Sequence, residues 1–259
     1  MKMKRFIILT LVLLAVIGCA GILNTYALED GKRYNWGLVP SGEHSKVRFN
    51  HSPEELRQYD TFCIGGPDEK VLYLTFDMGY VNMNAERCVE ILDKHDVKAS
   101  FFILEHVVHN YFHTLKAMHE NGHEICNHTL KHKDMCAVTD FEAYSAELLG
   151  LESLYKEKTG YDMTKFYRPP RGEFTKQALE YNQKLGFKTI FWSLAYVDWD
   201  DKNQPDPTAS FKKVIDRTHN GAVILLHPTS ETNAKILESL IIEWKRQGYR
   251  FELLGHLTA

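Results

Sequence analysis

The chain has 259 residues and a formal net charge of −3, and 44% of its residues are hydrophobic and 25% are charged. These values exclude a disordered tail, a collagen-like fibre and a polytopic membrane protein. The near-neutral balance gives no support for nucleic-acid binding, which usually needs a basic surface. Five cysteines are too few for a fold of this length to be held together by disulfide bonds. We expect free, mostly buried thiols, with a Cys126–Cys136 pair as the alternative in an exported protein.

The first 27 residues differ from the rest of the chain. They contain three basic residues and no acidic ones, and an apolar run, broken only by Thr10 and small residues, occupies residues 6–23. This pattern predicts an export signal. Cleavage near Ala27, lipidation of Cys19 and retention as a membrane anchor stay open, and each places the remaining residues outside the cytoplasmic membrane. That remainder holds 28 basic and 34 acidic residues, so its net charge is −6.

Residues 28–70 are polar and rich in glycine and proline, and we expect a leader that wraps the domain. From residue 71 onward, short apolar runs alternate with helical patterns. The predicted strands are residues 71–76, 99–103, 123–127, 165–167, 187–192, 222–226 and 249–254. The predicted helices are residues 85–95, 107–120, 140–158, 176–185, 210–219 and 233–247. This alternation predicts one parallel α/β domain over residues 71–259, closed into a barrel or nearly so.

Ionisable residues follow several of these strands, at the end where sites gather in parallel α/β folds. Asp77 follows the first strand, where a partly desolvated carboxylate suits a general base, although a turn aspartate is the alternative. His227 directly follows the strand at residues 222–226 and is a candidate general acid, or else a satisfied core histidine. Asp198 is expected to hold such a histidine in its charged form, unless it is simply a loop aspartate.

His128 and His132 are four residues apart. On a helical turn both imidazoles would reach one divalent ion, although two solvated histidines would show the same spacing. Asn127 precedes the pair and is expected to orient the imidazoles.

Arg168 and Arg171 flank two prolines, whose fixed φ angles define the local backbone. A guanidinium fork suits a carboxylate partner, either Asp77 or an acidic substrate. Two solvated arginines on a surface turn are the alternative.

In this order the motifs resemble the NodB-homology polysaccharide deacetylases, carbohydrate esterase family four, from residue 71 to about residue 254. The matching segments are Thr75-Phe76-Asp77-x-Gly79, His128-Thr129-x-x-His132, Arg168-Pro169-Pro170-Arg171-Gly172, Asp198-Trp199 and Leu225-Leu226-His227. Asn35-Trp36-Gly37 and Tyr80 make the chain similar to the delta-lactam-biosynthetic de-N-acetylase (PdaA-type) branch, which is associated with spore-cortex peptidoglycan.

The resemblance implies a distorted (β/α)7 barrel of the NodB-homology type and a set of catalytic roles. Asp77 matches the base that activates water, and Arg168 matches the arginine that pairs with it. His227 matches the acid that protonates the leaving amine, and Asp198 matches the carboxylate that tunes this histidine. A backbone N–H near Arg171 is the implied oxyanion donor.

The resemblance also implies a divalent metal ion, zinc or a similar ion, bound by His128 and His132. Most of the family completes this site with a second aspartate, and this chain has Met78 in that position. A thioether replaces a carboxylate poorly on such an ion, so we expect a weakly held metal, with metal-free substrate binding by the histidines as the alternative.

The implied function is hydrolytic de-N-acetylation of N-acetylmuramic acid in the spore-cortex muramic delta-lactam pathway, acting on peptidoglycan strands around the developing spore. Arg171 would suit the lactyl carboxylate, which glucosamine lacks, and Trp199, Tyr80 and Asn127 are the other expected substrate contacts. Membrane contact is expected only through the N-terminal segment. The alternatives are a deacetylase of N-acetylglucosamine, in peptidoglycan or chitin-like glycans, and a catalytically inactive wall-binding protein, which Met78 alone favours.

Overall fold

The computed structural model describes residues 28–40, 44 and 47–259. The predicted export signal, the apolar run at residues 6–23 and Cys19 lie outside the described residues. Within the described part, no helix combines the length and the apolar character that a membrane crossing needs.

A parallel sheet of eight strands forms the centre of the molecule, in the order β11-β5-β6-β7-β8-β10-β4, with β12 paired to the start of β5. Its strands are β4 (Thr61–Phe62), β5 (Val71–Met78), β6 (Ser100–Ile103), β7 (Glu124–Asn127), β8 (Phe166–Tyr167), β10 (Lys188–Ile190), β11 (Ala222–Leu226) and β12 (Arg250–Phe251). All seven predicted strands are therefore present. The eighth, β4, comes from the segment that we expected to act as a leader, and it pairs with β10.

Isolated hydrogen bonds close this sheet into a barrel. The backbone N–H groups of Ser193 and Leu194 donate to the carbonyl of Val223, and that of Leu225 donates to the carbonyl of Leu194. These bonds join the chain just after β10 to β11. Because the closure depends on single bridges and not on a continuous strand pair, the barrel is distorted, as predicted.

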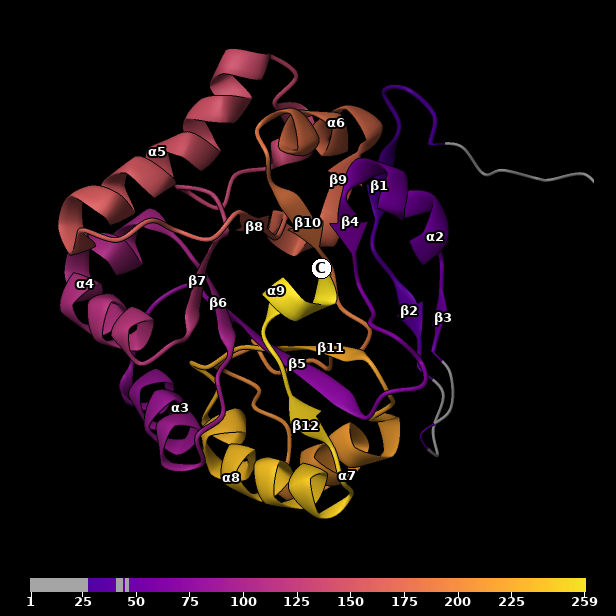
Figure 1. Cartoon of the computed structure of the whole chain (residues 1–259), viewed down its shortest axis with the longest axis vertical. Coiled ribbons are helices and arrows are strands. Elements are labelled where there is room, and N and C mark those ends of the chain that lie inside the picture. The colour runs from indigo at the N-terminus through magenta and orange to yellow at the C-terminus, as the bar shows by residue number, and fades with distance from the viewer. Residues whose placement is uncertain (1–27, 41–43, 45–46) are drawn as a thin grey trace, which may run out of the picture.

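Helices surround the sheet (Figure 1). They are α3 (Met83–Lys94), α4 (Glu105–Glu120), α5 (Phe141–Thr159), α6 (Lys176–Lys184), α7 (Pro207–Arg217) and α8 (Glu231–Arg246). Side chains of Asp140, Asp206 and Ser230 cap α5, α7 and α8 by accepting backbone N–H groups of the first turn. The predicted helices at 210–219 and 233–247 began too late, because the caps at Asp206 and Ser230 start them two or three residues earlier.

The N-terminal residues cover one side of the barrel. They form β1 (Arg33–Asn35), β2 (Leu38–Val39), β3 (Arg48–Phe49), α2 (Pro53–Leu56) and the 3-10 turn η1 (Arg57–Tyr59). β1 pairs in antiparallel register with β9 (Glu173–Thr175), and β2 pairs with β3. The Trp36 ring stacks on Phe191 with centroids 4.8 Å apart, which fixes this segment beside the end of β10.

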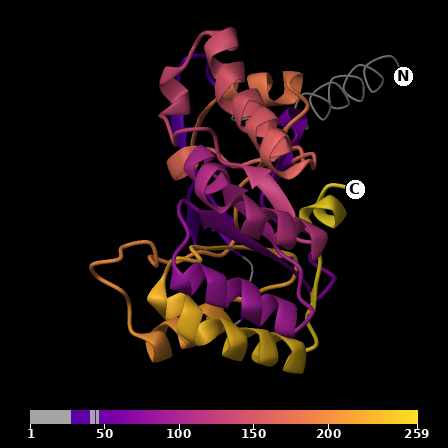
Figure 2. The ribbon, with the colours of Figure 1, turned by 90° about the vertical axis from the view of Figure 1, so that its left-hand side faces the viewer.

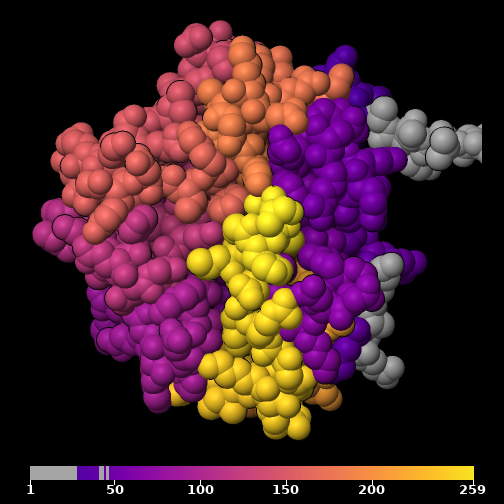
Figure 3. Space-filling view, in the orientation of Figure 1, coloured from indigo at the N-terminus to yellow at the C-terminus, as the bar shows by residue number. Residues whose placement is uncertain are grey.

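The barrel is plugged at the end where its strands begin. Helix α9 (Leu254–Leu257) buries Leu254 and Leu257 against Val71 and Phe102 inside the barrel. The Glu124 carboxylate at the start of β7 accepts the backbone N–H of Leu254 at 3.1 Å. Figure 3 shows the yellow C-terminal residues filling the centre of this face. In Figure 2, α9 and the orange connection between β10 and α7 lie on opposite sides of the molecule.

Candidate active site

A cavity of about 540 Å³ opens at the opposite end of the barrel, where the strands finish. Its lining combines two acid–base groups, two further histidines, one arginine and several apolar side chains. The lining residues are Asp77, His128, His132, Arg171, Gly172, Trp192, Trp199, Leu225 and His227. They come from the ends of β5, β7 and β11 and from the segments after β8 and β10, so the barrel brings together residues that are far apart in sequence.

An ion pair between Asp77 and Arg168 forms the floor of the site. Arg168 Nη1 donates to Asp77 Oδ1 at 2.7 Å, and its Nη2 donates to Thr75 Oγ1 at 2.9 Å. Arg168 Nε donates to the carbonyl of Ile190 at 3.1 Å, and the guanidinium lies 4.1 Å from the centroid of the Phe102 ring. Each guanidinium nitrogen of this fully buried cation therefore has a hydrogen-bond acceptor.

This environment keeps Asp77 ionised. Burial, the largest influence, would raise its pKa. The charge and hydrogen bond of Arg168, together with the charges of His128 and His227, outweigh burial and hold the pKa of the Asp77 carboxyl below its ordinary value. The second oxygen, Oδ2, lies 3.7 Å from His128 Nε2, too far for a hydrogen bond. Because Arg168 bonds the other oxygen, Oδ1, and His128 is too far away to bond Oδ2, Oδ2 can accept a proton from water.

His128 and His132 are held by a loop after β7, and the predicted helical turn is wrong. Thr129 and His132 have φ angles of 74° and 54°, in the left-handed region. Asn127 Oδ1 accepts the Thr129 N–H at 2.9 Å, and Thr129 Oγ1 accepts the His132 N–H at 2.9 Å. These side-chain bonds replace helical ones and bring the two imidazole centroids within 5.0 Å.

Both imidazoles are kept neutral. Burial lowers the pKa of His128 to about 4, and it also lowers the pKa of His132. His128 Nδ1 lies 2.8 Å from the carbonyl of Arg168, and a carbonyl can only accept, so Nδ1 carries the proton. The lone pair of His128 Nε2 is therefore directed away from this carbonyl and available to a ligand.

His227 and Asp198 form the second acid–base unit. Asp198 Oδ1 lies 2.8 Å from His227 Nδ1, and Asp198 Oδ2 accepts the His227 backbone N–H at 2.8 Å. Buried Asn233 donates to Asp198 Oδ2 at 2.6 Å and to the carbonyl of His227 at 2.9 Å. Burial would lower the pKa of His227, but the bond to Asp198 and its charge raise it above the ordinary value. The protonated imidazole is thus favoured, as a general acid requires.

Arg171 and Trp199 lie at the rim of the cavity. The Arg171 side chain is about half exposed, and the residue has a φ of 59° within the 3-10 turn η3 (Pro170–Gly172). Gly172 follows with a φ of 68°, and a Cβ there would come within 2.7 Å of the Trp192 ring. This turn therefore needs glycine. Trp199 is 61% exposed although it lines the cavity, so its ring is available to a ligand.

One expected substrate contact needs correction, and the positions of Tyr80 and Met78 bear on the site. Asn127 is wrong as a substrate contact, because it is fully buried and its amide bonds the carbonyl of Leu148 and the N–H of Thr129. Tyr80 is partly exposed and its hydroxyl donates to Asp201, and the residue is not among those that line the cavity. Met78 is 1% exposed and packs in the hydrophobic core, so it is no ligand for the histidine site.

Other contributors were missed in the sequence. Trp192 and Leu225 line the cavity, and Asn233 fixes the Asp198–His227 pair. The position of Leu225 could have been predicted, since it lies two residues before His227 and side chains two apart along a strand point to the same face. The role of Asn233 could not have been predicted, because it depends on where the first turn of α8 meets the end of β11.

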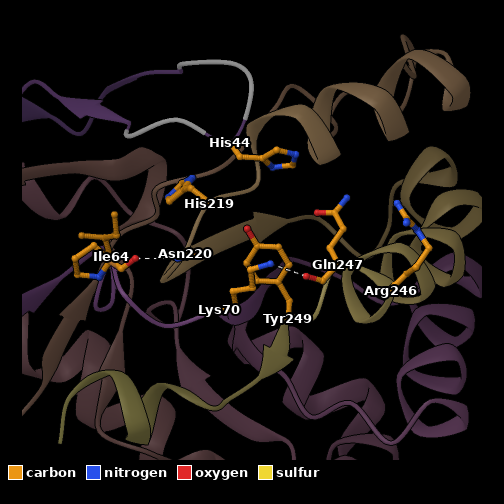
Figure 4. Close-up of a pocket in the computed structure, with 9 residues that line it drawn as sticks. His44, Ile64, Lys70, His219, Asn220, Arg246, Gln247 and Tyr249 are labelled. Atoms are coloured by element: carbon orange, nitrogen blue, oxygen red, sulfur yellow. Dashed lines mark hydrogen bonds between the residues drawn. The ribbon is translucent and has the colours of Figure 1, made fainter.

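A larger cavity of about 810 Å³ lies elsewhere on the surface (Figure 4). Its basic and amide groups are already used within the protein. Lys70 Nζ donates to the carbonyl of Gln247 at 2.8 Å, and Asn220 donates to the carbonyl of Pro67 at 2.9 Å. Arg246 points its guanidinium to Glu243, and His44 Nδ1 lies 2.9 Å from the carbonyl of Thr218. No pair of acid–base groups of the kind seen in the smaller cavity lines it, among the residues described.

The histidine pair fits a divalent ion as two of its ligands. Both rings are neutral and close together, and His128 has its second nitrogen fixed by a carbonyl, as in many metal sites. In the described part of the chain, the one group of three close ligand residues is Asp134, Cys136 and Glu173, which does not include either histidine. A metal at the histidines would therefore take its remaining ligands from water or substrate oxygens.

Comparison with known proteins agrees with this geometry. The family description "Polysaccharide deacetylase" matches residues 65–190. The chain is 35% identical over 244 residues to the peptidoglycan-N-acetylmuramic acid deacetylase PdaA of Bacillus subtilis, covering 94% of this chain and 92% of that protein. It is 37% identical over 235 residues to an uncharacterized protein of Geobacillus stearothermophilus, covering 90% of this chain and 88% of that protein.

The structure of Bacillus subtilis PdaA, described as a family 4 carbohydrate esterase, superimposes with a TM-score of 0.84 at 33% identity. The match covers 88% of this chain and 98% of the PdaA chain. The fold, the order of the motifs and these similarities lead to one conclusion: this chain belongs to the polysaccharide deacetylase family, carbohydrate esterase family 4, in the PdaA-like branch, and it is a deacetylase.

Proposed function

We propose that the protein hydrolyses the N-acetyl group of N-acetylmuramic acid residues in peptidoglycan. The observation that carries this proposal is one cavity lined by Asp77, whose pKa is lowered, by His227, whose pKa is raised, and, at its rim, by the half-exposed Arg171. The similarity to PdaA, whose name states N-acetylmuramic acid, supports the choice of sugar.

Asp77 is the proposed general base. Its Oδ2 faces the cavity side of the ion pair, while Arg168 holds Oδ1 and fixes the carboxylate plane. Asp77 takes a proton from water, and the resulting hydroxide attacks the carbonyl carbon of the acetamido group. The charge of Asp77 changes when it takes this proton, and the nearby positive charge of Arg168 compensates it. Arg168 itself does not contact the substrate.

His227 is the proposed general acid. Asp198 holds Nδ1, so the proton on Nε2 is the one directed toward a ligand. When the C–N bond breaks, this proton passes to the departing amine and acetate is released. A backbone N–H near Arg171 is the proposed donor to the oxyanion that forms before the bond breaks.

His128 and His132 are the proposed metal ligands, with a zinc-like ion held weakly because the protein offers two nitrogen donors here. When bound, such an ion would polarise the amide carbonyl.

Arg171 is the proposed contact to the lactyl carboxylate of muramic acid, and Trp199 supplies an apolar wall for the sugar ring. Once the acetyl group is removed, the free amine can cyclise with the lactyl carboxyl. We therefore place the enzyme in the muramic delta-lactam pathway of the spore cortex, outside the cytoplasmic membrane. The predicted export signal at residues 1–27 supports this location, and it is the only membrane contact that we propose.

Mass spectrometry of peptidoglycan glycans treated with the purified protein tests this function. Glycans with and without stem peptides should be compared, in the presence and absence of a chelator. We expect acetyl loss from muramic acid residues only. Acetyl loss from glucosamine would favour the alternative substrate, and glycan binding without acetate release under any divalent ion would favour a non-catalytic wall-binding protein.

A further inference from the structure

Four charged side chains form a cluster beside the rim of the catalytic cavity. They are Arg33, Asp134, Arg171 and Glu173, and we call them the rim charge cluster. Arg33 Nη2 lies 2.6 Å from Asp134 Oδ2, and Arg33 Nη1 lies 3.3 Å from Glu173 Oε2. Arg171 Nη2 lies 3.7 Å from Glu173 Oε2 and 4.0 Å from Asp134 Oδ2. Both arginines therefore share the same two carboxylates.

Three separate pieces of backbone bring this cluster together. Antiparallel pairing of β1 with β9 sets Arg33 opposite Thr175 and so beside Glu173. Asp134 is fixed as the cap of the 3-10 turn η2 (Met135–Ala137), where its Oδ1 accepts the Cys136 N–H at 3.1 Å. The geometry is therefore set by the fold and does not depend on Arg171.

The two arginines are bound unequally. Arg33 makes the short contacts, and its hydrogen bond lowers the pKa of Asp134. Arg171 makes only longer contacts, and it alone of the four lines the catalytic cavity. With Arg33 present the cluster is formally neutral, and without Arg33 its net charge becomes −1.

We propose that Arg33 is a specificity-determining positioning residue: by neutralising Asp134 and Glu173, it leaves the Arg171 guanidinium available to a carboxylate-bearing sugar. This inference rests on the proposed function, since the carboxylate is the lactyl group of muramic acid. It gives the N-terminal segment a role in substrate choice although Arg33 itself lies outside the cavity lining.

A cation site is a weaker interpretation of the same residues. Ligand atoms of Asp134, Cys136 and Glu173 lie within 4.8 Å of one another. However, Arg33 and Arg171 already supply positive charge to both carboxylates, and burial raises the pKa of the Cys136 thiol to about 11, which disfavours the thiolate that a metal needs.

A charge series at the cluster tests the inference. Arg33→Met, Arg33→Lys, Glu173→Gln and wild type are compared on two glycans of equal length, one with free lactyl carboxylates and one of N-acetylglucosamine only. Arg48→Met, at an exposed arginine of β3 outside the cluster, is the matched control. Dissociation constants are measured for each variant with Asp77→Asn added, so that the glycan is not hydrolysed. Acetate release is measured for each variant with Asp77 intact.

We expect affinity for the carboxylate glycan to follow the cluster charge. Arg33→Met weakens it about fivefold, Arg33→Lys restores most of it, and Glu173→Gln tightens it. Added salt reduces these differences because the groups are partly exposed. Affinity for the neutral glycan stays unchanged in all variants, and so does kcat on the carboxylate glycan.

Equal weakening of both glycans by Arg33→Met would overturn the inference, because it would indicate a purely structural role. An unchanged affinity for the carboxylate glycan would also overturn it. These outcomes are distinct from a failure of the proposed function. If wild-type protein deacetylates glucosamine but not muramic acid, the proposed function fails, and the binding series still decides whether Arg33 controls carboxylate recognition.

Discussion

The two ends of the barrel are built from opposite kinds of side chain. At the end where strands begin, α9 inserts Leu254 and Leu257 into an apolar interior. At the end where strands finish, the cavity is lined by Asp77, three histidines and Arg171. One end therefore buries apolar surface, and the other keeps charged groups partly desolvated but paired.

This difference separates stability from chemistry. The plugged end gains free energy from the burial of apolar side chains. At the open end, hydrogen bonds offset the cost of burying two carboxylates: Arg168 donates to Asp77, and Asn233 donates to Asp198. Cavity size does not identify the site, because the 810 Å³ cavity is larger but its polar side chains are already hydrogen-bonded within the protein. The site is better identified by two groups in one cavity whose pKa values shift in opposite directions, Asp77 downward and His227 upward.

The largest effect should come from removing the base. Asp77→Asn is expected to lower acetate release about 10³-fold, because an amide cannot take the proton from water. Thermal unfolding of the variant provides the control for folding, since Arg168 keeps its bonds to Thr75 and the Ile190 carbonyl. Acetate release at the wild-type rate would remove Asp77 from the mechanism.

The acid unit should give the next largest effect and a change in pH dependence. Asp198→Asn removes the partner that raises the pKa of His227, so kcat at neutral pH should fall about 10²-fold. In wild type, activity is lost on the alkaline side as pH rises through the raised pKa of His227. It is lost on the acid side as pH falls through the lowered pKa of Asp77.

In Asp198→Asn the alkaline limb should move to lower pH while the acid limb stays in place. A pH–rate profile of kcat measures both limbs. An alkaline limb that does not move would separate Asp198 from the titration of His227.

The metal ligands should have a smaller effect. His132→Ala should weaken zinc binding and lower acetate release by about tenfold or more, because one of two protein nitrogen donors is lost. Isothermal titration with zinc measures the affinity. Met78→Leu is the matched control, and it should leave affinity unchanged because Met78 packs in the core. Equal loss in both variants would contradict the separation of Met78 from the site.

The plugged end should affect stability and leave the rate nearly unchanged. Leu254→Ala opens a cavity beneath α9 and should lower the free energy of unfolding by about 3 kcal/mol. Urea unfolding measures this loss, and kcat at a temperature where the variant is folded should match wild type. A large fall in kcat under those conditions would show that the two ends are coupled.

The strands and their polar ends could be predicted because both signals are local. The apolar run before Asp77 and the run before His227 each mark a strand and its last residue within a few positions. The helical turn at His128 and His132 could not be predicted correctly, because hydrogen bonds from Asn127 and Thr129 decide that loop. The role of Arg33 could not be predicted, since its partners Asp134 and Glu173 are 101 and 140 residues away in sequence.

The sequence by itself determined the alternation of strands and helices and the set of ionisable residues at the strand ends, because periodicity and composition act over a few neighbouring residues. Only the tertiary structure decided which of those residues meet. It directed Met78 into the core and buried Asn127, and it placed Asn233 on Asp198 and Arg33 beside Arg171. Side-chain direction in loops depends on distant hydrogen-bond partners, and barrel closure brings those partners within reach.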